Sequence, residues 1–354
     1  MRILDRYVGQ SVQLAVLGVL GVVMMLFILI NYVTEFEKIG RADYTTLKAF
    51  TYVLLWLPKL VYQFFPMAAL LGTMLGLGLL AGHSELVVIR AAGVSKLRIA
   101  LAAIKSLLAL ILIAFFIGEV VAPPAEQYAE QMKLQALGSR ISFNTTFGLW
   151  LRDGRTVINV RTVEPDGRLA GITLYEFDDQ RRLVRRIEAR SAVRQGEGWQ
   201  LQQVTVSDLR ADRVTSEHRE TLPWRTRLDR ELVGTISYHP DSLSLWNQYA
   251  YIRYLKRNGL DARLYELAMW NKIVMPLTIL AMVLLAVPFV FVSVRHGGIG
   301  RQVLFGFLIG IVFYILDRLM GQVGLVYDMP AWLAASTPTL VILIASAWLY
   351  RRLN

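Results

Sequence analysis

The sequence of 354 residues contains no cysteine. Without a thiol, the chain cannot form a disulfide framework, a cysteine-ligated zinc site, an iron–sulfur cluster or a cysteine nucleophile. Charged residues are also scarce, at 18% of the chain against about 25% in an ordinary soluble domain. Hydrophobic residues make up 55%. This composition excludes a disordered or strongly acidic protein and indicates a membrane protein.

The sequence also lacks the motifs of common enzyme classes. It contains no phosphate-binding loop, no zinc-protease helix and no nucleophile elbow. The histidines are scattered at loops and ends, and they are His83, His218, His239 and His296. Gly76 and Gly78 form a Gly-x-Gly pair inside an apolar run with no strand before it, which favours helix packing over a dinucleotide loop. We therefore expect no catalytic residue, no metal site and no cofactor in this chain.

Six apolar runs are long enough to cross a bilayer, because about 20 helical residues span a hydrocarbon core of about 30 Å. The runs cover residues 11–33, 50–82, 99–122, 267–294, 302–324 and 331–350. Three lie on each side of a long polar insert. The apolar stretch of the first run is too long for a cleaved signal peptide, and no small-residue cleavage site follows it. The sequence therefore predicts an α-helical membrane protein with six transmembrane helices.

The basic residues outside the insert predict the orientation. Nine of them lie at ends or loops that an even number of crossings places on one side. These are Arg2, Arg6, Arg90, Lys96, Arg98, Arg295, Arg301, Arg351 and Arg352. Only Asp5 and Glu85 oppose them there, and an excess of Lys and Arg marks the cytoplasmic side. We expect both termini in the cytoplasm and the insert outside, so the net charge of +11 gives no support to a nucleic-acid partner.

The polar insert shows the pattern of short β-strands over most of its length. Runs rich in β-branched and aromatic residues, such as 156–160 and 171–177, alternate with turn residues such as those at 165–167. This pattern indicates an all-β sandwich, a jelly roll or a related curved sheet.

Two helical segments flank the predicted β domain. Residues 124–137 extend the third span outward, and 241–258 begins at a capping Asp241 or Ser242 and ends at Gly259. The apolar face of the second segment consists of Leu245, Tyr249, Ile252 and Leu255. The predicted domains are 1–137 with three spans, 138–240 as a β jelly roll, 241–262 as a helical connection, and 263–354 with three spans.

The loop between the second and third spans predicts a short cytoplasmic helix near 84–92. Ser84 would cap this helix, Glu85 would lie in its first turn, and Gly93 would end it. A plain amphipathic helix at the membrane interface has the same pattern. Glu85 favours docking on a soluble partner, because an exposed carboxylate at a helix start can pair with an arginine of that partner.

Four basic residues lie near the predicted outer boundary of the first three spans. Lys38 and Arg41 follow the first span, Lys59 lies between two prolines of the second, and Lys133 lies beyond the third. We expect them to form a basic rim around a cavity that opens on the outer side. Snorkelling to lipid headgroups is the alternative explanation, and it suits Lys59 least.

Other residues of the spans predict packing and lipid contact. Charges inside the spans are expected to form internal ion pairs or packing contacts, and they are Lys105, Glu119, Asp317 and Arg318. Bulky apolar side chains offer surface for acyl chains, although packing against lipid explains them equally well. They are Phe64, Phe65, Met67, Phe313 and Tyr314.

Several separated motifs resemble the LptF/LptG permease family. They lie at residues 4–9, 64–72, 84–88, 118–119 and 121–123. Residues 313–317 and 148–150 are more similar to the LptG branch than to the LptF branch. The resemblance covers essentially the whole chain, and its motifs occur in the family's order.

The resemblance implies a fold of six transmembrane helices with an inserted, jelly-roll-like periplasmic domain in the inner membrane of a Gram-negative cell. It also implies the transmembrane subunit of an ABC transporter that extracts lipopolysaccharide and passes it to a protein bridge toward the outer membrane. The implied partners are an LptF-like permease, two copies of an LptB-like cytoplasmic ATPase that binds ATP and Mg, and a single-span LptC-like protein.

The resemblance implies that four basic residues bind lipopolysaccharide, and they are Lys38, Arg41, Lys59 and Lys133. The three lysines match family positions that face the phosphorylated glucosamines of lipid A. The family member compared has lysines where this chain has Asn31 and Glu37. The basic ring is therefore thinner here, and we expect the arginine to compensate.

Two further sets of residues take roles from the resemblance. The cavity or gate would be lined by Phe65, Met67, Phe313 and Tyr314. Glu85 would dock in a groove of the ATPase, with Ser84 and Arg90 beside it on the coupling helix.

Alternatives from other classes fit the sequence less well. A membrane-anchored sensor or scaffold needs only one or two spans. An intramembrane enzyme acting on lipid should show paired acids, a histidine cluster or a nucleophile with its base within the spans. Within the transporter class, the alternatives are the LptF paralogue or another ABC exporter permease with a periplasmic β domain.

Overall fold

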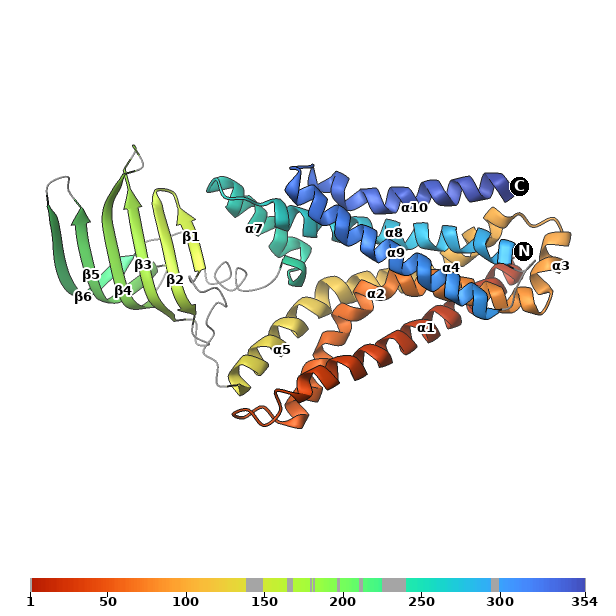
Figure 1. Cartoon of the computed structure of the whole chain (residues 1–354), viewed down its shortest axis with the longest axis horizontal. Helices are drawn as coiled ribbons and strands as arrows, with labels where there is room; N and C mark the ends of the chain where they lie inside the picture. Colours follow the sequence, from red (N-terminus) through yellow and green to blue (C-terminus); the bar gives the residue numbers. More distant parts are fainter. Residues whose placement is uncertain are drawn as a thin grey trace.

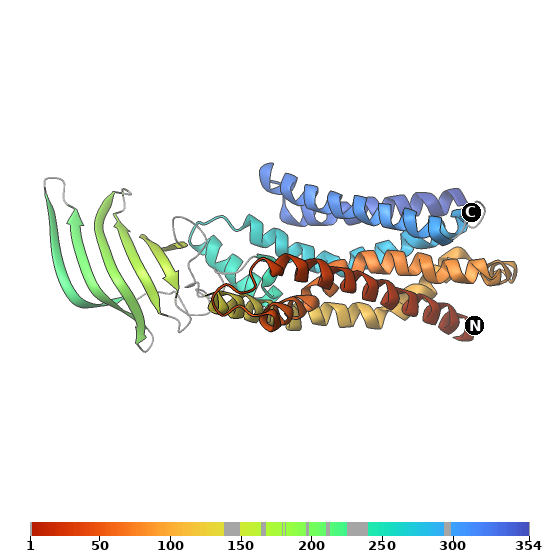
Figure 2. The same ribbon diagram turned by 60° about the horizontal axis from the view of Figure 1, so that its bottom comes forward.

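The computed structural model describes residues 2–137, 149–163, 168–178, 180, 182–195, 198–209, 213–224, 240–293 and 299–353. A long helical bundle and a curved β-sheet make up the described chain, and the sheet lies beyond one end of the bundle (Figure 1). Both chain ends lie at the opposite end of the bundle (Figure 2). The molecule therefore has an end that carries the sheet and an end that carries the termini.

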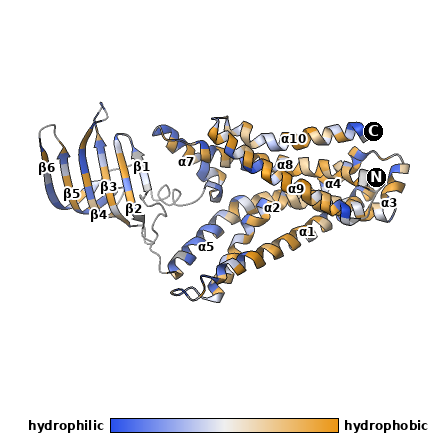
Figure 3. Ribbon diagram, viewed as in Figure 1, coloured by the Kyte–Doolittle hydropathy of each residue, from blue (hydrophilic) through white to orange (hydrophobic). Residues whose placement is uncertain are grey.

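Six long apolar helices form the bundle. The first half of the chain contributes α1 (Arg2–Phe36), α2 (Thr46–Gly82), α3 (Glu85–Ala91), α4 (Lys96–Phe116), η1 (Ile117–Val121) and α5 (Ala122–Ala136). The second half contributes α7 (Leu245–Arg257), α8 (Arg263–Ser293), α9 (Ile299–Val326) and α10 (Ala331–Leu353). The helices apolar enough to cross a membrane are Ile3–Phe36, Thr46–Gly82, Lys96–Lys133, Arg263–Phe291, Gly300–Val326 and Ala331–Arg352. The prediction of six spans is therefore confirmed. Figure 3 shows that hydrophilic residues gather on α5 and α7.

The two longest spans are much longer than a bilayer requires. Helix α2 has 37 residues, which corresponds to about 55 Å at 1.5 Å per residue. The third span runs from α4 through the π-helix η1 into α5 without a break, over 38 residues. A hydrocarbon core is only about 30 Å thick. Part of each helix therefore lies outside it, where charged residues can contact water.

Close packing of α1 on α2 depends on two glycines. A Cβ atom on Gly72 would lie 2.4 Å from the Cα atom of Val16, and one on Gly76 would lie 2.8 Å from the carbonyl oxygen of Ser11. The Ser11 hydroxyl donates a hydrogen bond of 3.0 Å to the Gly76 carbonyl across this contact. The structure thus confirms the helix packing predicted for Gly76, and Gly72 belongs to the same contact.

The helix starts correct the caps that the sequence predicts and show others. Ser95 caps α4, and its hydroxyl accepts the Arg98 N–H at 3.2 Å. Ser84 makes no capping hydrogen bond to α3, so its prediction as a cap is wrong. A capping side chain reaches the first turn from an extended backbone, whereas Ser84 is left-handed with φ of 62°.

The start of α7 also differs from its prediction. Asp241 and Ser242 do not cap α7, because they lie in a separate 3-10 helix, η2 (Pro240–Ser242). The cap is Ser244, which has extended backbone and accepts the backbone N–H three residues further on. The segment from 240 to 245 is thus a compact turn with its own contacts to the bundle.

Helix α7 connects the sheet to the bundle. Tyr254 packs against the core of the sheet, and the Asn258 side-chain oxygen accepts the Gly154 N–H at 3.4 Å. Tyr251 is buried beside Tyr254, with the two ring centroids 5.9 Å apart, and its own ring contacts Tyr265 of α8. Tyr249, which the sequence predicts on the apolar face, is instead 54% exposed.

The sheet is a single antiparallel meander among the described strands. Its strands are β1 (Leu149–Asp153), β2 (Thr156–Val163), β3 (Leu169–Phe177), β4 (Leu183–Gln195), β5 (Gly198–Leu209) and β6 (Val214–Trp224). Each strand pairs with the next in sequence. Ile158 lies opposite Leu174, and Val160 lies opposite Ile172, so their buried side chains share one face. The all-β prediction for the insert is confirmed, in the form of one curved sheet (Figure 2).

Candidate functional site

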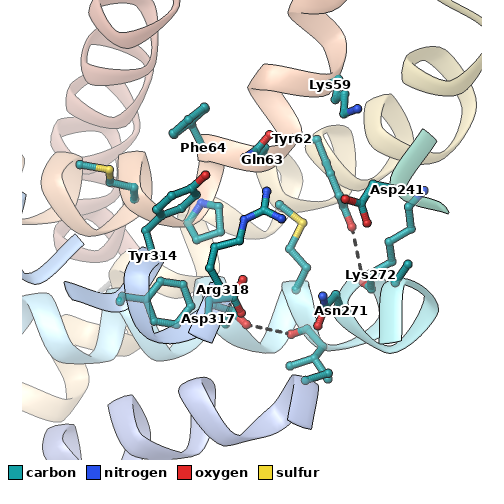
Figure 4. A pocket seen from close by; sticks show the side chains of 18 of the residues that line it. Lys59, Tyr62, Gln63, Phe64, Asp241, Asn271, Lys272, Tyr314, Asp317 and Arg318 are labelled. Carbon is teal, nitrogen blue, oxygen red and sulfur yellow. Dashed lines mark hydrogen bonds between the residues drawn. The ribbon is translucent and has the colours of Figure 1, made fainter. Parts of the chain in front are cut away.

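A cavity of about 390 Å³ lies between α2, α8 and α9. Its apolar wall contains Phe64, Pro66, Met67, Met275, Phe313 and Tyr314. Its polar wall contains Lys59, Gln63, Asp241, Asn271, Lys272, Asp317 and Arg318, all of which Figure 4 labels. The cavity therefore offers apolar surface on one side and groups of both charges on the other, which suits an amphipathic ligand.

Three of the four predicted gate residues line this cavity: Met67, Phe313 and Tyr314. The fourth, Phe65, is only 2% exposed and packs in the core of the bundle. Its neighbour Phe64 takes its place at the cavity and stacks on Tyr314, with ring centroids 6.5 Å apart. One residue turns a helix by about 100°, so adjacent phenylalanines face different directions.

Lys59 is the member of the predicted basic rim that lines the cavity. Its ammonium lies 2.6 Å from a carboxylate oxygen of Glu126 on α5 and 4.8 Å from the ring centre of Trp56. Glu126 is 5% exposed and also accepts a hydrogen bond of 2.6 Å from the Ser242 hydroxyl. Lys59 is therefore held at the cavity wall by a buried counter-ion and an aromatic face.

Lys38 and Lys133 lie together in a second cluster, on Glu35. The carboxylate of Glu35 lies 3.0 Å from the Lys38 ammonium and 2.7 Å from that of Lys133. The Tyr44 hydroxyl donates to the same carboxylate at 3.0 Å. Burial, and then this hydrogen bond to Glu35, raise the pKa of Tyr44. Two cations therefore share one buried anion. Glu130 adds a second negative charge nearby, because it accepts a hydrogen bond from Tyr52, whose ring centre lies 4.0 Å from the Lys133 ammonium.

The remaining basic residue, Arg41, is exposed in the turn between α1 and α2. Its backbone stabilises that turn, because its N–H donates to the Lys38 carbonyl and its carbonyl accepts from the Tyr44 N–H. Asn31 turns its amide back to the Phe27 carbonyl of its own helix at 2.8 Å. The structure therefore divides the predicted rim into Lys59 at the cavity, the pair on Glu35, and an exposed arginine.

The charges inside the spans have different environments. Glu119 of η1 forms an ion pair of 2.8 Å with Lys272 of α8. Arg318 lies over the ring of Tyr314, 5.6 Å from its centre, and lines the cavity together with Asp317. Lys105 lies on the outer surface of α4 instead.

Lys272 and the carboxylates of Glu126 and Glu35 are site residues that the sequence analysis missed. An ammonium inside a fourth span is costly without a partner, so Lys272 gave a usable signal. The two glutamates gave none, because each lies outside or at the edge of a predicted apolar run, where a charge needs no special partner.

The short helix α3 lies at the end of the bundle that carries the termini (Figure 1). Leu86 and Ile89 anchor it, since both are buried against the bundle. Val87 and Val88 are 57% and 66% exposed, and the sequence analysis did not single them out. The sequence could have indicated their exposure, because they lie between Leu86 and Ile89, whose spacing of three residues places both on the buried face of a helix.

The charged residues of α3 contact the same end of the bundle. The Arg90 guanidinium donates to the Val94 carbonyl at 3.1 Å and lies 6.0 Å from the ring centre of Phe291. The Glu85 side chain interacts with the Tyr7 hydroxyl of α1. Helix α3 is thus fixed to α1, to the start of α4 and to the end of α8, while its two valines face outward.

Comparison with known proteins gives a match over almost the whole length. The family model for the lipopolysaccharide export system permease LptF/LptG matches residues 6–352. The lipopolysaccharide export system permease protein LptG of Escherichia coli (strain K12) is 38% identical over 353 residues, covering 99% of this chain and 98% of the relative.

A second relative gives the same result. The protein of the same name from Haemophilus influenzae is 34% identical over 351 residues, covering 99% of this chain and 98% of the relative. These matches extend across all six spans and the inserted sheet. The chain therefore belongs to the lipopolysaccharide export system permease LptF/LptG family.

Proposed function

We propose that this chain is the LptG-type permease subunit of an ABC transporter that extracts lipopolysaccharide from the inner membrane. In this role it passes the lipid to a periplasmic protein bridge toward the outer membrane. The observation that carries the proposal is the match over 99% of the chain to relatives named LptG. The six apolar spans and the inserted sheet are consistent with it.

The cavity supplies a place for part of the lipid. We assign Met67, Phe313 and Tyr314 to acyl-chain contact, because they form its apolar wall. Each methylene buried in the bilayer contributes about 0.8 kcal/mol, so extraction of a lipid with several acyl chains is strongly uphill. The permease therefore needs work from a partner that hydrolyses ATP, with ATP and Mg bound to that partner.

The basic residues supply contacts for the phosphorylated headgroup. We assign this role to Lys38, Arg41, Lys59 and Lys133. The ammonium of Lys59 at the cavity wall and the two cations that share Glu35 support the assignment, because lysine donors suit phosphate oxygens.

Helix α3 supplies the surface for the ATPase. Its outward valines form an exposed apolar pair, and Ser84, Glu85 and Arg90 surround it. The partner in this role is a cytoplasmic ATPase of the LptB type, present in two copies. Exposed apolar residues along α1 and α9, such as Leu14, Met25 and Leu308, support further contacts with lipid, an LptF-like permease and a single-span LptC-like protein.

The proposed orientation places both termini and α3 in the cytoplasm, and the β domain of residues 138–240 in the periplasm. The basic residues at the end that carries the termini support it. The position of the sheet at the other end of the bundle agrees with that assignment (Figure 1).

Copurification from native membrane tests the proposal, with partners and bound lipid identified by mass. We expect lipopolysaccharide, a second permease and an ATPase. The double variant Lys59→Gln/Lys133→Gln should retain the protein partners and lose about tenfold or more in lipopolysaccharide affinity at low salt. Lys48→Gln is the matched control, because Lys48 pairs with the exposed Asp43. A complex without lipopolysaccharide, or unchanged affinity in the double variant, would contradict the proposal.

A further inference from the structure

The segment of residues 240–245, which we call the joint, leads from the β domain into α7. Two ion pairs of the bundle hold it. The Ser242 hydroxyl donates to the Glu126 carboxylate at 2.6 Å, and that carboxylate pairs with Lys59. At the other end of the joint, the Leu245 N–H donates to Glu119 at 2.7 Å. The joint is therefore fixed by carboxylates that also neutralise lysines.

The second ion pair joins Lys272 and Glu119, and each of these residues also forms a hydrogen bond to the joint. Lys272 pairs with Glu119 and donates a further hydrogen bond of 2.7 Å to the Leu243 carbonyl. Lys272 is 7% exposed, so this contact is nearly closed to water. The Gln248 amide adds a bond of 2.7 Å to the Pro240 carbonyl within the turn.

Both lysines belong to the wall of the cavity. Lys59 and Lys272 line it, as does Asp241 of the joint itself. Figure 4 shows all three at one end of the cavity, together with Tyr62, whose hydroxyl donates to the Lys272 carbonyl at 3.5 Å. A ligand in the cavity can thus contact the lysines that hold the joint, and Asp241 of the joint itself.

The two pairs differ in how easily a ligand can open them. The Lys59 side chain is 20% exposed, whereas those of Lys272 and Glu119 are 8% and 12% exposed. A phosphate carries more negative charge than a carboxylate and offers three acceptor oxygens. It can therefore compete with Glu126 for the Lys59 ammonium, while the Lys272 pair stays closed.

Loss of Lys59 leaves Glu126 in an unfavourable state. A carboxylate that is 5% exposed cannot stay ionised and unpaired without a large desolvation cost. Glu126 must then move toward water, and the Ser242 hydroxyl loses its acceptor. Removal of Lys59 would thus give the contact a second arrangement, which is what coupling between a site and a distant domain requires.

We infer that Glu126 is an internal counter-ion which the phosphate of bound lipopolysaccharide displaces from Lys59, and that this displacement frees the Ser242 end of the joint. The inference rests on the proposed function. In it, filling of the cavity loosens one end of the connection to the β domain, while Glu119 and Lys272 keep the start of α7 in place. Glu126 is a positioning residue and does not itself contact the lipid.

The test is hydrogen exchange of residues 240–248 in the complete complex, in nanodiscs, with and without lipopolysaccharide. We expect exchange in this segment to rise on addition of lipopolysaccharide and to stay unchanged with a phosphatase-treated sample. An equal rise with the treated sample, or with phosphatidylglycerol in the nanodisc, would overturn the inference. This arm needs no variant, so it does not depend on the folding of one.

Glu126→Gln provides the second arm, because the amide keeps the shape of the side chain and removes its charge. We expect about tenfold tighter lipopolysaccharide binding, because Lys59 no longer has a counter-ion to give up. We also expect exchange of residues 240–248 that no longer rises when lipid is added, because the amide oxygen can still accept from Ser242 and no ion pair remains to be displaced. Glu217→Gln is the control, because Glu217 pairs with Arg219 on the sheet, away from the cavity and the basic rim. It should behave as the wild type. Wild-type affinity and exchange in Glu126→Gln would overturn the inference, whereas absence of lipopolysaccharide binding in the wild type would overturn the proposed function instead.

Discussion

The two ends of the helical bundle use charge and apolar surface in opposite ways. At the end next to the sheet, Glu35, Glu119 and Glu126 are carboxylates of low exposure, each paired with one or more lysines. At the end next to the termini, α3 turns Val87 and Val88 outward. These three carboxylates are thus enclosed at one end, and this pair of valines is exposed at the other.

This difference separates two kinds of recognition. Enclosed ion pairs hold their groups in fixed positions at a desolvation cost, which suits a site that must distinguish a charged ligand. Exposed apolar side chains at a helix surface suit a protein partner that covers them. The predictions below test whether each end behaves in the way that its chemistry implies.

The largest effect is expected where one partner of the most enclosed pair is removed. Lys272→Met leaves Glu119 buried without a counter-ion, which costs about 3–5 kcal/mol of stability. The measurement is the thermal unfolding midpoint of the purified complex.

Two further variants control this result. Lys105→Met removes an exposed lysine of α4 and should change stability by less than about 0.5 kcal/mol. The double variant Glu119→Gln/Lys272→Met should recover part of the loss, because no charge is then left unpaired. If Lys272→Met and Lys105→Met were equally stable, the pair would not contribute as described.

The second effect concerns the other end of the bundle. Val88→Asp places a charge on the exposed face of α3, so we expect folding to be unaffected and ATPase retention on an affinity column to fall about tenfold or more. Leu86→Asp is the contrasting control, because Leu86 is buried and a charge there should prevent folding. Full retention of the ATPase by Val88→Asp would show that the valines are not part of the interface.

The features that the sequence predicted correctly depend on local pattern. Apolar runs of 20 or more residues identify the spans, because few other structures require them. Short runs of β-branched and aromatic residues, separated by turn residues, identify the strands of the insert because this pattern is typical of β-strands. Each pattern lies within one segment of chain, so no knowledge of distant contacts was needed.

The features that it missed depend on contacts between distant segments. Lys59 meets Glu126 across 67 residues, and Lys133 meets Glu35 across 98. No local spacing shows which acid meets which base. The prediction of Phe65 at the cavity is wrong for a related reason. Phe64 lines the cavity instead, because the direction that each ring faces depends on how α2 packs against α1 and α9.

The third effect distinguishes two serines that precede helices at the same end of the bundle. Ser95→Ala removes a capping hydrogen bond and should cost about 1 kcal/mol, whereas Ser84→Ala should leave stability within about 0.5 kcal/mol because Ser84 caps nothing. Unfolding midpoints of the two variants provide the comparison. Equal losses would mean that Ser84 acts as a cap after all.

The smallest expected effect is the loss of an exposed ion pair at the end of the bundle next to the sheet. Lys48 pairs with Asp43 at 2.5 Å, but the Asp43 side chain is 80% exposed, so Lys48→Ala should cost less than about 1 kcal/mol, and less still at high salt. Lys133→Ala should cost more, because the Glu35 carboxylate that it leaves is 7% exposed and keeps only Lys38 as its cation. Unfolding measured for both variants at low and high salt separates the cases. If both variants lost the same stability, and salt reduced both losses equally, the solvent exposure of an ion pair would not determine how much it contributes at this end of the bundle.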